Sequence, residues 1–366
     1  MDNFVCANAA MQRGLIYEFY ALQKTGRRAV KLRFGYSIEI DKTPDPAILI
    51  NHAVLAEKNG FEAIWAGDHF HPWLHTGVGC PQVWVWLAAV AERTKKVNLG
   101  TGVTAPIFRY HPALVAQTFA TLGVMYPDRI FLTVATGEAM NEVPMGYPWP
   151  PHRERAERLE EAIRIIRALW TRDFVNFNGK YFHLSKANLY TKPQKPIPLY
   201  VASSGATVAE LAGKYGDGFL TGDPDLDFCR NVLFPAVDKG AKASGKRPDE
   251  VIKMVSLSAA YDPDLDRALG SCLRWSVTSL PAFYKYPIYD PREIESYVRW
   301  ISKEQIAKAW PLIGASAEDH IKGIEKYIQA GFTDIQICDF SPNEEEFMKL
   351  YGERVLPYLR ETYGKN

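Results

Sequence analysis

The sequence has few cysteines, and they form no motif. Its 366 residues include five, namely Cys6, Cys80, Cys229, Cys272 and Cys338, and no two of them have Cys-x-x-Cys spacing. An odd, scattered set argues against a disulfide framework and against a structural zinc site. Because free thiols are usual in a reducing compartment, we expect a cytoplasmic protein.

Long apolar runs and an excess of one charge are also missing. No stretch approaches the ~18–20 apolar residues that a membrane-spanning helix needs. No apolar segment follows the pair Arg27-Arg28, so a twin-arginine export signal is not predicted either. Lys and Arg number 43 against 42 for Asp and Glu, a net charge of +1. We therefore expect no nucleic-acid partner and no membrane partner.

No linker rich in Gly, Ser or Pro divides the chain, and strand-like and helix-like segments alternate along it. Each predicted strand is a short apolar run, as is typical of strands that helices cover on both faces. The predicted strands are 32–38, 63–69, 97–104, 129–137, 197–204, 218–222, 251–262 and 332–340. Each is followed by a helical segment, and the last helix is expected near 344–361. Eight such units in one domain predict an α/β fold, the (β/α)8 TIM barrel.

Three segments fall outside this repeat. Residues 1–31 form an N-terminal extension to which we assign no role, ahead of a single barrel domain at 32–366. Insertions are predicted at about 174–192 and 277–315. The first carries Asn178-Gly179 between two β-rich arms, which predicts a hairpin with a type I′ turn. We expect the insertions to lie over the C-terminal mouth of the barrel, where barrel enzymes keep their sites.

The stretch GDHFHPWLH, residues 67–75, holds three of the eight histidines. Asp68 and His69 end the second predicted strand, so the barrel places them at its mouth. A metal site built on His69, His71 and Asp68 is one interpretation. However, the further ligands of such sites come from later strand ends as His or Asp, and here those ends offer Thr, Gly, Glu and Ser, with Asp339 at the last one, so we predict no metal. His71 and His75 are interpreted as loop residues.

Other predicted strand ends converge on the same mouth. One of them joins a strand to a helix N-terminus at Ser204-Gly205, where free N–H groups and the helix dipole favour a phosphate. The residues at these ends are Gly102, Val103, Thr136, Gly137, Glu138, Asn141, Ala202, Ser203, Ser204 and Gly205.

Three segments together resemble the luciferase-like barrel oxidoreductases, and among them the branch that uses the deazaflavin coenzyme F420. They are GDHFHPWLH, then APIFRYHPALVAQTFATLGVMYPDRIFLTVATGEAMNEVP at 105–144, then LYVASSG at 199–205. The resemblance extends from about Leu32 to Tyr358. It implies a TIM barrel that binds F420 without a metal, transfers a hydride from a hydroxyl-bearing carbon to the deazaflavin, and forms a homodimer.

The resemblance also implies roles for single residues. His69 matches a residue that accepts the substrate's hydroxyl proton, Trp73 one at the reacting centre, and Glu138 one that protonates or binds beside the ring. Glu39 and Asp41 are alternative matches to a glutamate after the first strand and are candidates for substrate contact. Gly102-Val103 matches a cis peptide of relatives. The matches to the coenzyme site are Asp68, Gly102, Val103, Thr136, Gly137, Asn141, Ala202, Ser203, Ser204 and Gly205.

The substrate is less defined. In members of the branch that oxidise glucose-6-phosphate, two lysines and an arginine hold the phosphate. Only Lys285 matches here, and Pro224 and Ala309 stand at the other two positions. A dianion in a partly dry pocket needs more than one cation. We therefore favour a secondary alcohol or an unphosphorylated hydroxy compound, with a sugar phosphate as the alternative. An FMN-dependent monooxygenase or reductase of the same fold, a metallohydrolase and a non-catalytic binding barrel are further alternatives.

Overall fold

The computed structural model describes residues 32–364, and within this range eight parallel strands close into a barrel. Closure follows from β8, which pairs with β7 on one side and β9 on the other. The predicted TIM barrel is confirmed, whereas the prediction for residues 1–31 lies outside the described residues. In order around the barrel, the strands are β1 (Arg33–Ile38), β2 (Ala63–Ala66), β3 (Asn98–Thr101), β4 (Ile130–Val134), β7 (Leu199–Ala202), β8 (Gly218–Gly222), β9 (Ile252–Tyr261) and β11 (Asp334–Asp339).

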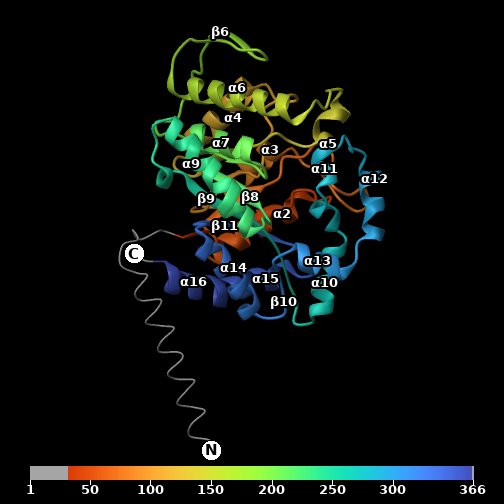
Figure 1. Ribbon diagram of the computed structural model, residues 1–366. Coiled ribbons are helices and arrows are strands. Elements are labelled where there is room, and N and C mark those ends of the chain that lie inside the picture. Colours follow the sequence, from red (N-terminus) through yellow and green to blue (C-terminus); the bar gives the residue numbers. More distant parts are fainter. Residues whose placement is uncertain (1–31, 365–366) are drawn as a thin grey trace, which may run out of the picture.

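Helices lie around the outside of this barrel (Figure 1). The helices that follow the strands in sequence begin at local signals. At the first of them Asp45 is the N-cap residue, and its side chain accepts a hydrogen bond from the N–H of Ala47. Pro46, the first residue of the helix, has the backbone angle that a helix start needs. They are α2 (Pro46–Lys58), α3 (Val83–Arg93), α4 (Pro112–Met125), α6 (His152–Thr171), α7 (Ala206–Tyr215), α9 (Phe234–Ala243), α14 (Ala317–Ala330), α15 (Glu344–Leu350) and α16 (Leu356–Tyr363). The other helices are α5 (Ala139–Glu142), α8 (Leu226–Phe228), α10 (Leu265–Leu273), α11 (Ala282–Lys285), α12 (Pro291–Ser296) and α13 (Lys303–Ala309).

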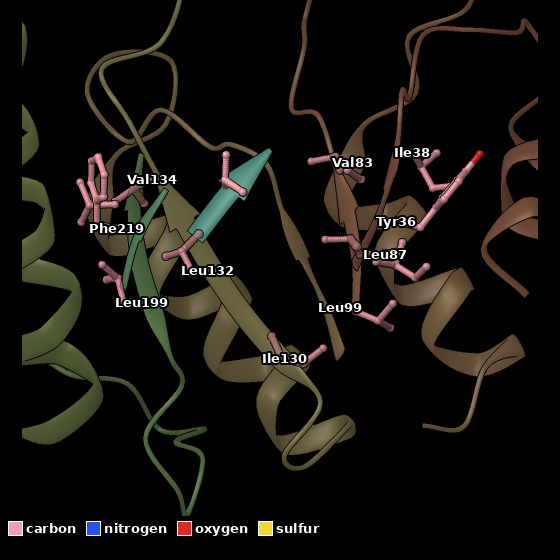
Figure 2. Packing of buried hydrophobic residues seen from close by; sticks show 14 of the residues in the cluster. Tyr36, Ile38, Val83, Leu87, Leu99, Ile130, Leu132, Val134, Leu199 and Phe219 are labelled. Atoms are coloured by element: carbon pink, nitrogen blue, oxygen red, sulfur yellow. The ribbon is translucent and has the colours of Figure 1, made fainter. Parts of the chain in front are cut away.

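Alternation along each strand divides the apolar side chains into two layers. Side chains such as Tyr36, Leu99 and Leu132 belong to the large cluster that fills the space between strands and helices (Figure 2). Trp65 and Phe131 point the other way and fill the interior, with ring centroids 4.4 Å apart. The lower barrel is therefore a packed core, and only its upper end is left open for a ligand.

The first insertion differs from its prediction in two ways. It is a hairpin of β5 (Val175–Asn178) and β6 (His183–Ala187), but Asn178 pairs with His183, so the turn spans residues 179–182 instead of two residues. The Glu161 carboxylate of α6 accepts hydrogen bonds from the N–H groups of residues 180–182 and fixes this wider turn. The hairpin follows a helix, not a strand, so it packs on α6 and does not lie over the mouth as we predicted (Figure 1).

The second insertion does lie over the mouth. It contains α11, α12 and α13, and residues between 278 and 311 line the central cavity. The chain then forms the short strand β10 (Leu312–Gly314), which pairs with β9 outside the barrel ring and is missing from the sequence prediction. Among the described residues, four cysteines are free, and no helix is long and apolar enough to cross a bilayer.

Candidate active site

A cavity of about 1340 Å³ opens at the C-terminal ends of the strands. Most of the residues chosen from the sequence meet there, from six different segments of the chain. Those that line it are Glu39, His69, Trp73, Gly102, Val103, Thr136, Gly137, Glu138, Ala202, Ser203, Ser204, Gly205 and Lys285. Asp41, Asp68 and Asn141 are not among the residues of its wall.

His69 follows β2 and faces the cavity with a largely buried imidazole, whose side chain is 11% exposed. Its Nδ1 lies 3.8 Å from Oδ2 of Asp41, which is longer than a hydrogen bond, so the attraction acts mainly between charges. Burial disfavours the charged imidazole, but the carboxylates of Asp41, Glu138 and Glu39 outweigh it and raise the pKa of His69 to about 9. At neutral pH the imidazole of His69 is therefore mostly protonated.

Asp41, a candidate for substrate contact, lies behind this wall. It is fully buried, and its Oδ2 also accepts a hydrogen bond of 2.8 Å from the backbone N–H of Trp73. One carboxylate thus stands beside both His69 and the loop that carries Trp73. The Trp73 ring is nearly perpendicular to that of His69, with centroids 6.1 Å apart. This arrangement holds two predicted catalytic side chains in fixed relation to each other.

Asp68, predicted to contact the coenzyme, is also buried behind the wall. It accepts hydrogen bonds of 2.6 Å from Thr104 Oγ1 and 2.8 Å from Arg109 Nη2. The backbone N–H of Arg109 donates in turn to Glu142, a buried side chain of α5. Burial raises the pKa of Glu142 to about 7, with the charge of Arg109 opposing the rise. Arg109 therefore ties the end of β2 to the helix that follows Glu138.

Asn141 makes the second tie between these two segments. Its Oδ1 accepts from the backbone N–H of Phe70, and its Nδ2 donates to Oε2 of Glu138 at 2.9 Å. Asn141 is 1% exposed, so it orients Glu138 from behind and does not line a ring pocket as predicted. Arg109, Glu142 and the bridging role of Asn141 were missed because sequence spacing does not show which buried polar groups pair across two loops.

The loop at residues 203–205 has the features of an anion site. Ser203 Oγ accepts a hydrogen bond of 3.0 Å from the N–H of Gly205. The 10-residue helix α7 then begins with no side-chain cap, and a Cβ placed on Gly205 would meet nothing within 4 Å. The first backbone N–H groups of α7 are thus free to bind a phosphate.

Arg155 is a further cation of the cavity that the sequence analysis missed. It lies in the first turn of α6, is 4% exposed, and stacks on Trp149 at 4.0 Å from the ring centroid. Its Nε has no hydrogen-bond partner, although the guanidinium lines the cavity. Burial lowers the pKa of Arg155, with the charge of Glu138 opposing this. A buried guanidinium with free donors is suited to an anionic group of a bound molecule.

The strand ends β3 and β4 provide a surface of small residues. The Gly102–Val103 peptide bond is cis, as the resemblance implied. Gly137 has a φ of +69°, and a Cβ there would lie 2.7 Å from Cβ of Ala105, so only glycine fits. A flat ring system can approach the backbone closely at this surface.

The second insertion adds the wall opposite this surface. Tyr284 and Lys285 of α11 line the cavity, and the Tyr284 ring lies 5.8 Å from that of Trp73. Pro224 and Ala309, which the resemblance aligns with two phosphate-binding cations, line it as well. Lys308 precedes Ala309 and also lines the cavity.

The remaining histidines of residues 67–75 point elsewhere. His71 contacts the carbonyl oxygen of Tyr289 through Nδ1 at 3.1 Å, and His75 is exposed. Neither lines the cavity. In residues 32–364, no group of three or more His, Cys, Asp or Glu side chains is arranged to hold a metal ion.

A polar mouth on a closed parallel barrel, with an imidazole, a carboxylate and a phosphate-ready loop, defines a barrel enzyme. The model of the family described as luciferase-like monooxygenase matches residues 29–334, and the chain belongs to this family. It is 37% identical over 336 residues to "F420-dependent glucose-6-phosphate dehydrogenase" of Microbacterium testaceum, covering 92% of this chain and 99% of the relative. The protein of the same name from Intrasporangium calvum is 40% identical over 341 residues, again covering 92% and 99%.

Solved structures give the same grouping. An "F420-dependent secondary alcohol dehydrogenase in complex with an F420-acetone adduct" superposes with a TM-score of 0.87 at 38% identity, covering 90% of this chain and 99% of that chain. A coenzyme F420-dependent tetrahydromethanopterin reductase from Methanopyrus kandleri has a TM-score of 0.73 at 22% identity, covering 90% and 99%, and shows a shared fold alone.

Proposed function

We propose that this protein is an F420-dependent dehydrogenase that oxidises a hydroxyl-bearing carbon of a secondary alcohol or an unphosphorylated hydroxy compound. The observation that carries the proposal is that His69 and Glu138, from different strand ends, line one cavity together with a loop free to bind phosphate. The names of the relatives at 37–40% identity support the coenzyme.

The residues present fit this coenzyme. Backbone donors at 203–205 and the free donors of Arg155 suit its phosphate-bearing tail, and the small residues Gly102, Val103 and Gly137 suit a flat ring. When bound, F420 supplies a deazaflavin ring that accepts a hydride. No group of metal-binding side chains is required for this chemistry.

The protein's own residues manage the proton that leaves the hydroxyl group. Because Asp41 stands beside Nδ1 of His69, the Nε2 atom of the neutral imidazole, the form that higher pH favours, is the one left to accept that proton. Glu138, held by Asn141, is placed to supply or withdraw a proton at the coenzyme side. The Trp73 ring, 6.1 Å from the His69 ring between centroids, is placed to limit the entry of water.

A sugar-phosphate substrate is the second candidate. Lys285 and Lys308 both line the cavity, and two cations could hold a phosphate dianion. Against this candidate, Pro224 and Ala309 remove two of the three charges that relatives use.

Coenzyme binding tests the proposal directly. Titration of the protein into oxidised F420 and, separately, into FMN should quench the fluorescence of F420 at micromolar protein while leaving FMN free. Tight binding of FMN with no binding of F420 would replace this proposal with a flavin-dependent function. The homodimer implied by the resemblance stays a prediction, for which light scattering of the purified protein is the test.

A further inference from the structure

The wall of the cavity divides into two arcs of neighbouring strands. Small residues at the ends of β3, β4 and β7 form one arc, and polar side chains from β1, β8, β9 and β11 form the other. His69, at the end of β2, stands at one junction between them. We call the second group the polar arc, and its members are Ser37, Glu39, Asp223, Ser256, Ser258 and Gln336.

Strand register places these side chains in two levels. Gln336 of β11 is in register with Ser256 of β9, and Cys338 is in register with Ser37 and Ser258. Side chains at alternate positions of a strand point the same way, so both levels face the interior of the barrel. Hydrogen-bonding groups therefore continue down the wall from the mouth on this side.

Gln336 shares the lower level with Ser256 and lacks a partner for its oxygen. It is 3% exposed and lines the cavity, yet its Oε1 accepts no hydrogen bond. A buried amide oxygen left unpaired costs free energy unless something in the cavity pairs with it. A hydroxyl group has the donor that this oxygen needs.

Carboxylates extend the same surface toward the mouth. Asp223 accepts from the N–H of Ser258 at 2.8 Å and from its Oγ at 2.6 Å, which fixes the carboxylate and leaves further lone pairs free. Glu39 lies nearer to His69 and lines the cavity. The polar arc contains acceptors and hydroxyl groups but no cation, so it suits neutral hydroxyl groups better than a phosphate.

We propose that the polar arc binds several hydroxyl groups of an uncharged polyhydroxy substrate, such as an unphosphorylated sugar or a cyclitol. This rests on the proposed function and specifies its substrate class. One hydroxyl would give its proton to His69 while neighbouring hydroxyls pair with Gln336, Ser256 and Asp223, and bound F420 would supply the hydride acceptor. A monohydroxy alcohol leaves the oxygen of Gln336 unpaired, and sites built to bond a hydroxyl discriminate strongly against analogues that lack it.

A substrate panel with oxidised F420 tests this class. We expect kcat/KM for glucose or myo-inositol to exceed that for isopropanol by at least about 100-fold. We expect glucose-6-phosphate to be no better than glucose. A preference for isopropanol would overturn the inference while leaving the dehydrogenase proposal in place. Failure of every compound to reduce F420, together with failure to bind it, would instead overturn the proposed function.

Two variants, on different strands, test whether the polar arc causes the preference for polyols. Gln336→Met and Ser256→Ala should each lower kcat/KM for the preferred polyol by about 10–100-fold, as expected for a lost hydrogen bond to a buried group, and should change that for isopropanol by less than about threefold. The matched control is Ser279→Ala, whose hydroxyl also lies at the cavity but donates to the carbonyl oxygen of Ser276. It should behave like the wild type.

Calorimetric titration with the same polyol separates binding from turnover. The polyol should bind the wild type and the Ser279→Ala protein with equal affinity and bind Gln336→Met more weakly. Unchanged polyol affinity and kcat/KM in both polar-arc variants would contradict the inference. If Gln336→Met does not fold, as judged by its melting curve, Ser256→Ala alone decides the outcome.

Discussion

Oδ2 of Asp41 lies 3.8 Å from Nδ1 of His69 and accepts a hydrogen bond from the N–H of Trp73. A single buried carboxylate thus sets the charge of the imidazole and the position of the tryptophan loop. The same relationship raises the pKa of His69, so the proposed proton acceptor is mostly charged at neutral pH.

The first prediction concerns His69 itself. His69→Ala should lower kcat by ~10²–10⁴-fold, the usual contribution of general acid–base catalysis, while coenzyme affinity changes little. His71→Ala is the matched control, because His71 contacts a backbone carbonyl outside the cavity. Steady-state kinetics with separate coenzyme titration measures both. If His71→Ala lowers kcat strongly while His69→Ala leaves kcat near that of the wild type, the assignment is refuted.

The second prediction concerns pH. A histidine must be neutral to accept a proton, and the carboxylates around His69 raise its pKa to about 9. The rate of oxidation should therefore increase as pH rises from 7 toward 9, and the reverse reduction of the carbonyl compound should slow over the same range. A flat profile for both directions would show that the titration of His69 does not limit either reaction.

The third prediction tests whether Asp41 is the group that raises the pKa of His69 and so sets that pH profile. Asp41→Asn keeps an oxygen for the N–H of Trp73 but removes a negative charge, so the pKa of His69 should fall toward its ordinary value. The pH profile of oxidation should shift to lower pH by about one unit or more. An unshifted profile would assign the raised pKa to Glu39 or Glu138 instead.

The fourth prediction concerns Glu138. Glu138→Gln preserves a group that Asn141 can bond but cannot exchange a proton at this position. F420 should still bind with near-normal affinity, and turnover should fall by ~10²-fold or more. Unchanged turnover would restrict Glu138 to a structural role.

The fifth prediction concerns the anion site. Arg155→Gln removes a buried cation with free donors, so it should weaken binding of F420 by about 10-fold or more while leaving the affinity for a deazaflavin riboside without the phosphate tail nearly unchanged. Fluorescence titration with both molecules measures the ratio. If Arg155→Gln weakens the binding of both molecules equally, the guanidinium does not contact the phosphate-bearing tail.

Much of this architecture could be predicted from the sequence because its signals are local. Short apolar runs followed by amphipathic helices predict the barrel, and a polar residue at a strand end lies at its mouth, as His69 and Glu138 do. The turn at 179–182 could not be predicted, because Glu161 from another helix overrides the local preference of Asn178-Gly179.

Pairings between buried polar groups could not be predicted from the sequence either. From the sequence, Asp68 resembles a ligand-binding residue at a strand end. In the structure its carboxylate instead pairs with Arg109, 41 positions later, behind the cavity wall. The polar arc is spread over β1, β8, β9 and β11, and only the register between these strands brings its members together.

The central claim is hydride transfer from a hydroxyl-bearing carbon to F420. The most direct measurement follows the loss of absorbance of oxidised F420 when the purified protein is mixed with a polyol or a secondary alcohol, with the carbonyl product identified. The account predicts one carbonyl formed for each F420 reduced, without added metal, and loss of the reaction in His69→Ala. Tight binding of F420 with no reduction by any hydroxy compound of the panel would contradict it.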